Sequence, residues 1–342
     1  MNLRRIALIS LLCCTVGIPL TGQAETKLVF NVFLPPGHFL RAESARWAAE
    51  VEKATEGRVK VEIPAGSLAP PPQQLSAVKS GIADMAVMAN VFLGRGAPLT
   101  QMSTMPFLVS DASAASVALW RVHEKHLAAK NEFKDVQLLS LFHFSPGYLY
   151  SMTDAPVNSV DELKARRMWA LPGEAADVMK SLGVSPVTAP AVKVNESVST
   201  GVVNAVYGLS ADAMVDFKAS AYVKALTKFP KGATSTSFSL FINKAKWASL
   251  SEQDRKIIQG LTGEAFARRA GLAARKNGDE AIAQMKSAGV RIVDADPKFY
   301  QALQGAAKTS YDAFKAAAAQ KGLDGGKLVE AFAAEYQSLE GK

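Results

Sequence analysis

Apolar positions along the chain repeat with two different periods, one typical of strands and one typical of helices. Residues 59–63 alternate apolar and polar side chains, so that every second one can face a core. After the turn Pro35-Pro36-Gly37, apolar or small residues recur at helical spacing, at Leu40, Ser44, Trp47, Ala48 and Val51. Pieces of both kinds follow one another along most of the chain, and this order predicts an α/β protein.

The same patterns predict the remaining elements. Two strand-like runs are interrupted at Ser145-Pro146-Gly147, which indicates a crossing between two lobes. The sequence Ser159-Val160-Asp161-Glu162 is a capping box that opens a short helix. We expect strands at 27–34, 59–63, 85–88, 136–144, 184–188 and 236–242 and near Met168, and helices after Gly37 and at 73–80, 112–129 and 178–182.

Residues 251–288 predict one unusually long helix. They contain no proline and are rich in alanine, glutamate, glutamine, lysine and arginine. At 1.5 Å per residue these 38 residues would reach about 57 Å, long enough to run behind both lobes. A kink can form at any of four glycines that each cost about 1 kcal/mol relative to alanine, namely Gly260, Gly263, Gly271 and Gly278.

The amino terminus has the order of a secretory signal peptide. Arg4 and Arg5 give a positive start, residues 6–20 are apolar, and small residues precede Glu25. We expect cleavage after Ala24 and a periplasmic location. Both cysteines, Cys13 and Cys14, lie inside this segment. A lipid anchor needs a small residue directly before the modified cysteine, but Leu12 precedes Cys13 and Cys13 precedes Cys14, so we expect no lipid anchor.

Composition and charge exclude several classes of protein. The 342-residue chain is long enough for two domains, and its 49% hydrophobic and 20% charged residues are typical of a globular protein. Without residues 1–24, 37 lysines and arginines remain against 31 acidic residues. Their signs alternate, and no block of five like charges occurs. We therefore expect a solvated surface and no nucleic-acid partner.

The chain lacks the common nucleotide-binding, nucleophile-elbow and zinc-protease motifs. His123 and His126 stand three residues apart on an expected helix and could share a metal ion, but an ordinary exposed face is the favoured interpretation. His143 ends an apolar strand and is interpreted as a core or crevice residue. We expect no enzymatic activity, no metal and no cofactor.

Several short motifs resemble, in their order and spacing, the solute-binding subunits of TRAP (tripartite ATP-independent periplasmic) transporters. Each motif is weak alone, and together they cover nearly the whole chain after residue 24. They are Gly57-Arg58-Val59, Pro64-Ala65-Gly66-Ser67-Leu68, Gly81-Ile82-Ala83-Asp84-Met85-Ala86, Met105-Pro106-Phe107-Leu108, Val160-Asp161-Glu162-Leu163-Lys164, Leu182-Gly183-Val184-Ser185-Pro186-Val187, Thr200-Gly201-Val202-Val203 and residues 247–261.

The resemblance implies a two-lobe α/β binding protein with a ligand cleft between the lobes and a long helix spanning both. The first lobe would comprise residues 25–146 and 236–270, and the second residues 147–235 and 271–342. Such a receptor closes on a small organic molecule and delivers it to integral membrane subunits. Two other classes stay open: a periplasmic sensor protein that presents the ligand to a signalling receptor, and an exported enzyme on the same fold.

The chain departs from the family where most members carry a ligand-binding arginine. Counting from the Asp161-Glu162-Leu163-Lys164 motif, that arginine falls on Trp169. An indole supplies neither the charge nor the paired donors that a carboxylate accepts from a guanidinium. We therefore expect dicarboxylates to bind poorly and the ligand to be neutral, aromatic, cationic, or a monocarboxylate held by other donors. The alternative is that Arg166 or another cation reaches the pocket.

Six side chains are the candidates for contacting the ligand. Trp169 occupies the arginine position, where its ring can contact the ligand or, alternatively, pack under the crevice. Tyr207 lies in the next strand of the second lobe. Phe33, His38 and Asn90 follow strands of the first lobe, where ligands of open α/β sheets bind. Tyr148 lies in the crossing segment.

Overall fold

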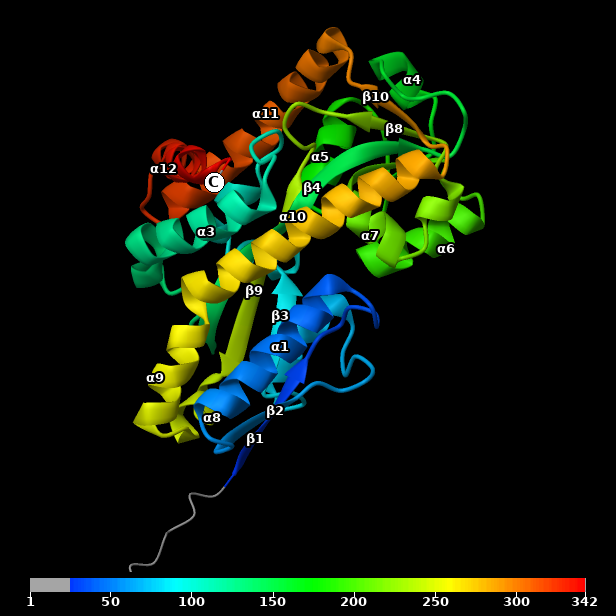
Figure 1. The fold of residues 1–342 in the computed structure, drawn as a ribbon. Helices are drawn as coiled ribbons and strands as arrows, with labels where there is room; N and C mark the ends of the chain where they lie inside the picture. The colour runs from blue at the N-terminus through cyan, green and yellow to red at the C-terminus, as the bar shows by residue number, and fades with distance from the viewer. Residues whose placement is uncertain (1–24, 342) are drawn as a thin grey trace, which may run out of the picture.

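The computed structural model describes residues 25–341, apart from the side chain of Arg95, and the expected signal peptide and its two cysteines lie outside this range. The fold is a mixed α/β structure of two lobes (Figure 1). Its strands are β1 Thr26–Asn31, β2 Val59–Glu62, β3 Met85–Ala89, β4 Val136–Ser151, β5 Met168–Ala170, β6 Val187–Thr188, β7 Ala205–Ser210, β8 Ala225–Lys228, β9 Ser235–Asn243 and β10 Arg291–Asp294. Its helices are α1 Phe39–Ala54, α2 Gln74–Lys79, α3 Ala112–Val122, α4 Val160–Lys164, α5 Glu174–Ser181, α6 Val194–Ser199, α7 Ala211–Asp216, α8 Lys244–Ser249, α9 Glu252–Leu261, α10 Gly263–Ser287, α11 Pro297–Gln320 and α12 Gly325–Leu339.

Two long antiparallel strands, β4 and β9, connect two groups of parallel strands into one sheet. The order is β2-β1-β3-β9-β4-β7-β5-β6, with β8 pairing to both β4 and β10. Strands β1, β2 and β3 run parallel, as do β5, β6 and β7. Because β9 is antiparallel to both β3 and β4, and β7 is antiparallel to β4, the two groups run in opposite directions. The carboxyl ends of both groups therefore point toward the boundary between the lobes.

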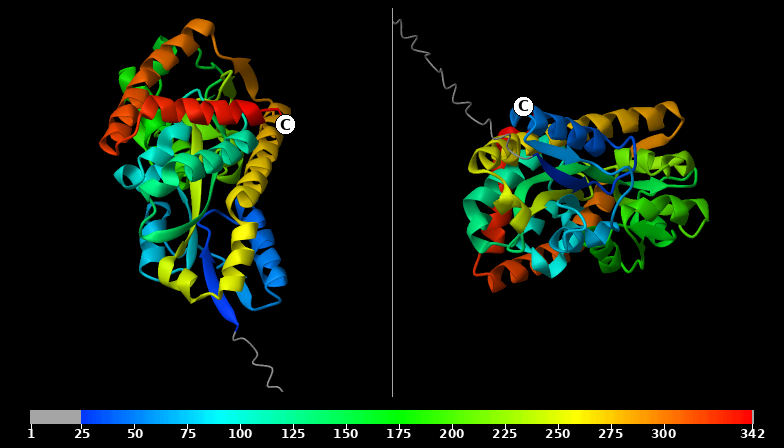
Figure 2. Two further views of the ribbon diagram at one scale, coloured as in Figure 1. Left: turned by 90° about the vertical axis from the view of Figure 1, so that its left-hand side faces the viewer. Right: turned by 90° about the horizontal axis from the view of Figure 1, so that it is seen from below.

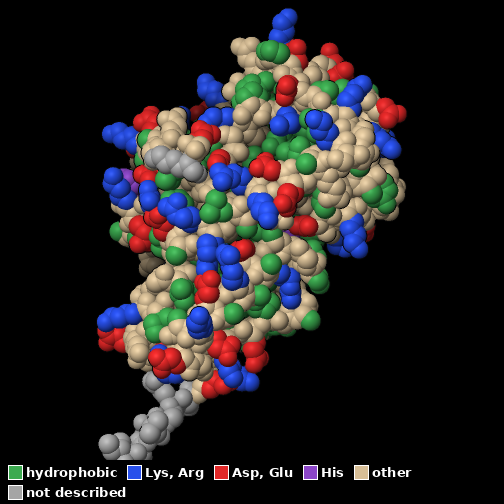
Figure 3. All heavy atoms as spheres, viewed as in Figure 1, with side chains coloured by type: hydrophobic (Ala, Val, Ile, Leu, Met, Phe, Trp, Pro, Cys, Tyr) green, Lys and Arg blue, Asp and Glu red, His purple; other side chains and the backbone are tan. Residues whose placement is uncertain are grey.

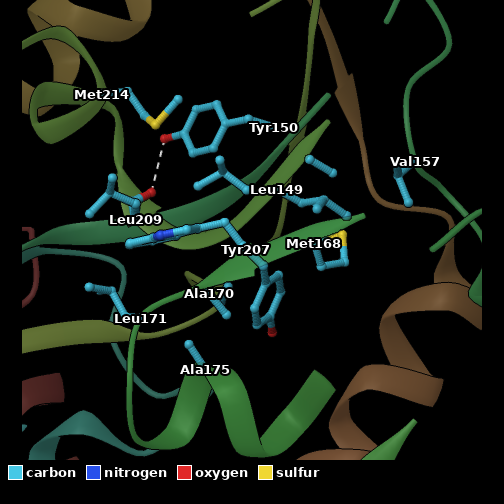
Figure 4. Close-up of a cluster of buried hydrophobic side chains, with 14 of the residues drawn as sticks. Leu149, Tyr150, Val157, Met168, Ala170, Leu171, Ala175, Tyr207, Leu209 and Met214 are labelled. Carbon is cyan, nitrogen blue, oxygen red and sulfur yellow. Dashed lines mark hydrogen bonds between the residues drawn. The ribbon is translucent and has the colours of Figure 1, made fainter. Parts of the chain in front are cut away.

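Strand β4 passes from the core of one lobe into the core of the other. Leu139 and Phe142 belong to a first-lobe cluster, and Leu149 and Tyr150 belong to the second-lobe cluster. Strand β4 does not break at the expected interruption, Ser145-Pro146-Gly147. It continues through these residues, and its pairing with β9 shifts register between His143 and Pro146. In the second-lobe core, Tyr150 donates a hydrogen bond to the Leu209 carbonyl oxygen at 3.0 Å (Figure 4).

The expected long helix is divided into two pieces. Helix α9 ends at Leu261, α10 begins at Gly263, and the backbone of Gly263 has a φ of +57°. Helix α10 still spans both lobes, because its first half packs in a first-lobe cluster and Ala281 and Met285 pack in the second. At 1.5 Å per residue its 25 residues extend about 37 Å.

Two of the four glycines expected to weaken this helix lie at close contacts. A Cβ at Gly271 would lie 2.7 Å from the Ala112 carbonyl oxygen on α3. A Cβ at Gly278 would lie 2.8 Å from the Cβ of Ser145 on β4. These glycines let α10 approach α3 and β4 more closely than a helix with side chains at both positions could.

The last two helices bring the chain back to the first lobe. Phe299 and Leu303 at the start of α11 lie in the second-lobe cluster, whereas Phe314 near its end packs in a first-lobe cluster. Helix α12 packs along α3, and the Tyr336 hydroxyl accepts a hydrogen bond from the Asp111 amide at 3.0 Å (Figure 2). The sequence predicts residues 271–342 in the second lobe, whereas the burial of the apolar face of α12 against α3 places that helix with the first.

The helix expected at 112–129 ends earlier, at Val122, and continues as a π-helical turn over His123–Leu127. His123 is buried and stacks on Trp120 with ring centroids 5.9 Å apart, and this burial lowers its pKa to about 4. Within residues 25–341, no group of three potential metal-binding side chains occurs. Acidic and basic side chains are interspersed over the face shown in Figure 3. No described helix is long and apolar enough to cross a membrane.

The glycines of α9 and α10 generate a paired prediction. Gly260→Ala should raise the free energy of unfolding by about 0.5–1 kcal/mol, because a methyl group there meets nothing within 4 Å and alanine favours the helix. Gly278→Ala should lower it by about 1–3 kcal/mol, because the methyl group collides with Ser145. Urea denaturation monitored by circular dichroism measures both free energies of unfolding. If both variants were stabilised, or both destabilised, the result would contradict the close contact at Gly278.

Candidate functional site

A largely apolar cavity lies where the carboxyl ends of the two strand groups converge. It contains about 560 Å³ of space, part of it open to solvent. Segments that follow β1, β3, β5, β6 and β7 all contribute to its wall. The lining of this apolar cavity comprises Phe33, Leu34, Pro71, Ala89, Val91, Phe92, Phe144, Ser145, Leu171, Pro190, Ala191, Val192, Leu209, Ser210, Ala213, Phe217, Thr236 and Phe238.

Five phenylalanines give the apolar cavity an aromatic wall. Phe144 and Phe238, on the crossing strands β4 and β9, stack with ring centroids 3.9 Å apart. Phe33 follows β1 of the first lobe, and Phe217 follows α7 of the second. Aromatic rings are thus presented from both lobes, and a flat apolar molecule between them would contact both.

A second, smaller cavity lies beside the first and is lined largely by hydroxyl groups. It contains about 310 Å³ and shares Val91, Leu171 and Thr236 with the apolar cavity. We call it the hydroxyl cavity, since its wall includes Thr104, Thr234, Ser235, Thr236 and Ser237. The two together offer one apolar and one hydrogen-bonding compartment.

Glu174 is the only ionisable side chain among the described residues that line the two cavities. It is the first residue of α5 and lies beside Thr104. Burial raises the pKa of Glu174 to about 7, and the nearby Asp177 acts in the same direction. The described lining contains no lysine, arginine or histidine that could neutralise a charged ligand.

A histidine and an aspartate face each other across the lobes beside the apolar cavity. His38 of the first lobe lies 3.7 Å from Asp216 of the second, measured from Nε2 to Oδ2. The Nδ1 atom of His38 accepts a hydrogen bond from the Leu40 amide at 3.1 Å, so Nε2 carries the proton in the neutral ring. Burial lowers the pKa of His38 to about 3 and raises that of Asp216 to about 6.

The three candidates from the first lobe lie in or near this region. Phe33 lines the apolar cavity. His38 is buried behind it, with its ring centroid 5.4 Å from that of Phe144. Asn90 is buried, and its amide nitrogen donates to the Ser237 hydroxyl of the hydroxyl cavity at 3.0 Å.

The other three candidates lie in the second-lobe core and do not line either cavity. Trp169 is fully buried within β5, and its Nε1 has no hydrogen-bond partner among the described residues. Tyr207 is fully buried in β7 and points to the opposite side of the sheet from Tyr150 (Figure 4). Tyr148 packs against the same cluster, and its burial raises its pKa to about 12.

Neither arginine near Trp169 lines a cavity. Arg166 donates hydrogen bonds to the Thr153 hydroxyl at 2.8 Å and to the Ala155 carbonyl at 3.0 Å. Arg167 is exposed and donates to the carbonyl oxygens of Gly201 and Val202. Both guanidinium groups thus hold loops of the second lobe.

Sequence reasoning missed the wall that the second lobe contributes. Leu171 follows β5 directly, Pro190 lies two residues after the end of β6, and Ser210 is the last residue of β7. The rule that selected Phe33 and Asn90 also applies to these strand ends. Residues inside the second-lobe strands were chosen instead, and there neighbouring side chains face the core.

Asp212 is a buried carboxyl group on α7, between Ser210 and Ala213 of the apolar-cavity lining. It follows Ser210 on α7, and neither of its oxygens has a hydrogen-bond partner among the described residues. Burial, together with the nearby Asp216, raises the pKa of Asp212 to about 7. An ionised Asp212 therefore destabilises the fold at high pH.

Comparison with known proteins gives matches over nearly the whole chain. The family model described as bacterial extracellular solute-binding protein, family 7, matches residues 30–317. The outer membrane transporter protein TsaT of Comamonas testosteroni is 34% identical over 98% of each chain.

Solved structures with the same fold include receptors with bound aromatic acids. A TRAP periplasmic solute-binding protein from Bordetella bronchiseptica, solved with bound (R)- and (S)-mandelate, is 30% identical; the match has a TM-score of 0.86 and covers 92% of this chain and all of that one. A marine metagenome TRAP solute-binding protein specific for aromatic acid ligands, solved with 3-hydroxybenzoate, is 27% identical, with a TM-score of 0.84 and coverage of 93% and 99%.

Asp212 generates a prediction about stability and pH. Its pKa is raised in the folded state from an ordinary value of about 4, so the folded protein loses stability as the pH rises from about 4 to about 7. Asp212→Asn should therefore raise the free energy of unfolding by about 2–4 kcal/mol at pH 8 and change it little at pH 4. Chemical denaturation at both pH values tests this, and an equal gain at both would show that charge is not the cause.

Proposed function

The chain belongs to the bacterial extracellular solute-binding protein family 7, the solute receptors of TRAP transporters, and from this premise we propose that it binds a small aromatic acid and delivers it to TRAP membrane subunits. Members of this family bind solutes and are not enzymes, so the ligand leaves the receptor chemically unchanged. The observation that carries the proposal is the apolar cavity, with its five phenylalanines and no described cation.

The comparisons support an aromatic acid as the class of ligand. The Bordetella bronchiseptica receptor holds mandelate, and the metagenome receptor holds 3-hydroxybenzoate. Each of these molecules has one aromatic ring and one carboxyl group, which suits a site with one apolar and one hydroxyl-lined compartment. Of the ligand classes that the sequence left open, a monocarboxylate held by donors other than arginine fits both the cavity and the relatives.

We assign different roles to the six candidate residues. The Phe33 ring would contact the ligand, while His38 and Asn90 would fix the shape of the wall behind it. Trp169 would act indirectly, because a buried indole occupies the arginine position and leaves no guanidinium there to pair with a ligand carboxylate. Tyr207 and Tyr148 would support the core beneath the site.

The proposed mechanism is closure of the two lobes on the ligand. Rings from both lobes line the cavity, so a ligand between them binds the closed arrangement better than an open one and shifts the equilibrium toward it. The membrane subunits would then recognise the closed form. We further propose that residues 1–24 direct export to the periplasm and are removed there. No described feature or relative favours the sensor alternative.

Ligand charge gives the decisive test. We expect benzoate, mandelate or 3-hydroxybenzoate to bind at micromolar or lower concentration in calorimetry, and succinate and malate to bind at least about 100-fold more weakly, because a second carboxylate would be buried without a partner. Phe33→Ala should weaken aromatic binding by about tenfold, whereas Tyr222→Ala, which removes an aromatic ring from the surface, should leave it unchanged. Micromolar binding of a dicarboxylate would overturn the proposed ligand class.

Closure of the lobes gives a second test. A saturating ligand should reduce the radius of gyration measured by small-angle X-ray scattering, because the open ensemble is depleted. The same ligand, added to the Phe33→Ala variant at a concentration below the dissociation constant of that variant, should reduce the radius of gyration less. Identical scattering curves with and without a ligand that calorimetry shows to be bound would exclude closure.

A further inference from the structure

Glu174 occupies an unusual place for a carboxyl group in a site that receives acids. It follows Gly173, whose φ of +85° turns the chain at the end of β5, and lies at the amino-terminal end of α5. This position directs Glu174 into the wall of the hydroxyl cavity and of a neighbouring groove between α5 and α11. It is the only ionisable group in the described lining of the hydroxyl cavity.

The described surroundings of Glu174 offer no cation. On its own helix, Asp177 lies one turn away and is exposed. The side chains that face the shared groove from the segment 98–105 and from α11 are uncharged, and include Gln101 and Ser310. On the side of β9, the neighbouring groups are the hydroxyls of the hydroxyl cavity.

The hydroxyls next to Glu174 differ in what they can still bind. Thr234 donates to the Gly208 carbonyl at 3.2 Å, and Ser235 donates to the Phe144 carbonyl at 3.0 Å. Thr236 makes no side-chain hydrogen bond to any described residue and lines both cavities. An acid group that enters from the apolar cavity would therefore meet Thr236 at the boundary and Glu174 beyond it.

Glu174 is half-buried and the described lining supplies no cation, so two carboxylates that meet there are stabilised by sharing one proton. We propose that Glu174 receives the acid group of the ligand and holds a proton when the ligand is bound, so that the receptor takes up an aromatic acid anion together with one proton from solvent. The shared proton replaces the arginine as the partner of the ligand's carboxylate. This inference rests on the proposed function and specifies how its ligand is held.

The pKa of Glu174 sets the pH range in which ligand affinity depends on proton uptake. Burial already raises this pKa to about 7, and a bound anion raises it further. Below pH 7 the free protein holds the proton, so affinity should be nearly constant. Above pH 7 the proton must be gained on binding, so the affinity falls as the pH rises.

Calorimetry with benzoate and 3-hydroxybenzoate tests the coupling directly. The dissociation constant should rise about 30-fold between pH 6 and pH 8.5, which is 1.5 units above the pKa of the free protein. At pH 8, titrations in phosphate and in Tris, two buffers with different ionisation enthalpies, should report uptake of nearly one proton per ligand. Glu174→Gln should retain binding and abolish both effects, because the amide donates a hydrogen bond without titrating.

Two further variants serve as controls. Asp177→Asn removes an exposed carboxylate of the same helix and should leave the pH dependence in place. Asp212→Asn removes the other buried carboxyl near the site and should also leave it in place. Thermal unfolding of each variant establishes that it is folded.

The outcomes separate this inference from the proposed function. If no aromatic acid binds the unaltered protein at any pH, the proposed function fails. If aromatic acids bind with no proton uptake and with one affinity from pH 6 to 8.5, the inference fails while the proposed function stands. If the coupling persists in Glu174→Gln or disappears in Asp212→Asn, the proton lies elsewhere and the role of Glu174 is overturned.

Discussion

Strand β4 runs from one lobe into the other, and its hydrogen bonds fix the directions of the neighbouring strands β7 and β9. Antiparallel pairing to β9 on one side and to β7 on the other turns the two parallel groups against each other, so that both sets of carboxyl ends face the same boundary. The cavity, its aromatic wall and the hydroxyl compartment all lie where those ends converge. A change that reversed either pairing would move half of the lining away from the site.

The electrostatic character of the site follows from burial without cations. Glu174, Asp212 and Asp216 each have a raised pKa, and for each of them loss of contact with water is the largest cause. His38 is affected by the same burial in the opposite direction and stays neutral. In the proposed binding mode, a proton on Glu174 would take the role that fixed positive charges have in most anion-binding sites.

Much of the fold followed from the sequence, because ordered motifs and the two periodicities constrain each strand and helix locally. The aromatic position at the end of β1 was identified by the rule for strand ends, and Phe33 does line the cavity. The motif predicts that Trp169 contacts the ligand, but β5 is buried on both faces and Trp169 lies in the second-lobe core. The kink that the glycines allowed occurs at Gly263, whereas the return of α12 to the first lobe depends on contacts with α3, which no local pattern encodes.

Within residues 25–341 the chain passes between the lobes four times, through β4, β9, α10 and α11, so β1 and α12 lie on the same lobe. Thr26 lies in β1, and Tyr336 is fixed to the start of α3. Fluorophores attached next to Thr26 and Tyr336 would therefore keep a constant separation during the proposed closure, and energy transfer between them would not report ligand capture. A label on α12 paired with one on α4, at the far edge of the second lobe, would convert the proposed closure into an optical signal (Figure 1).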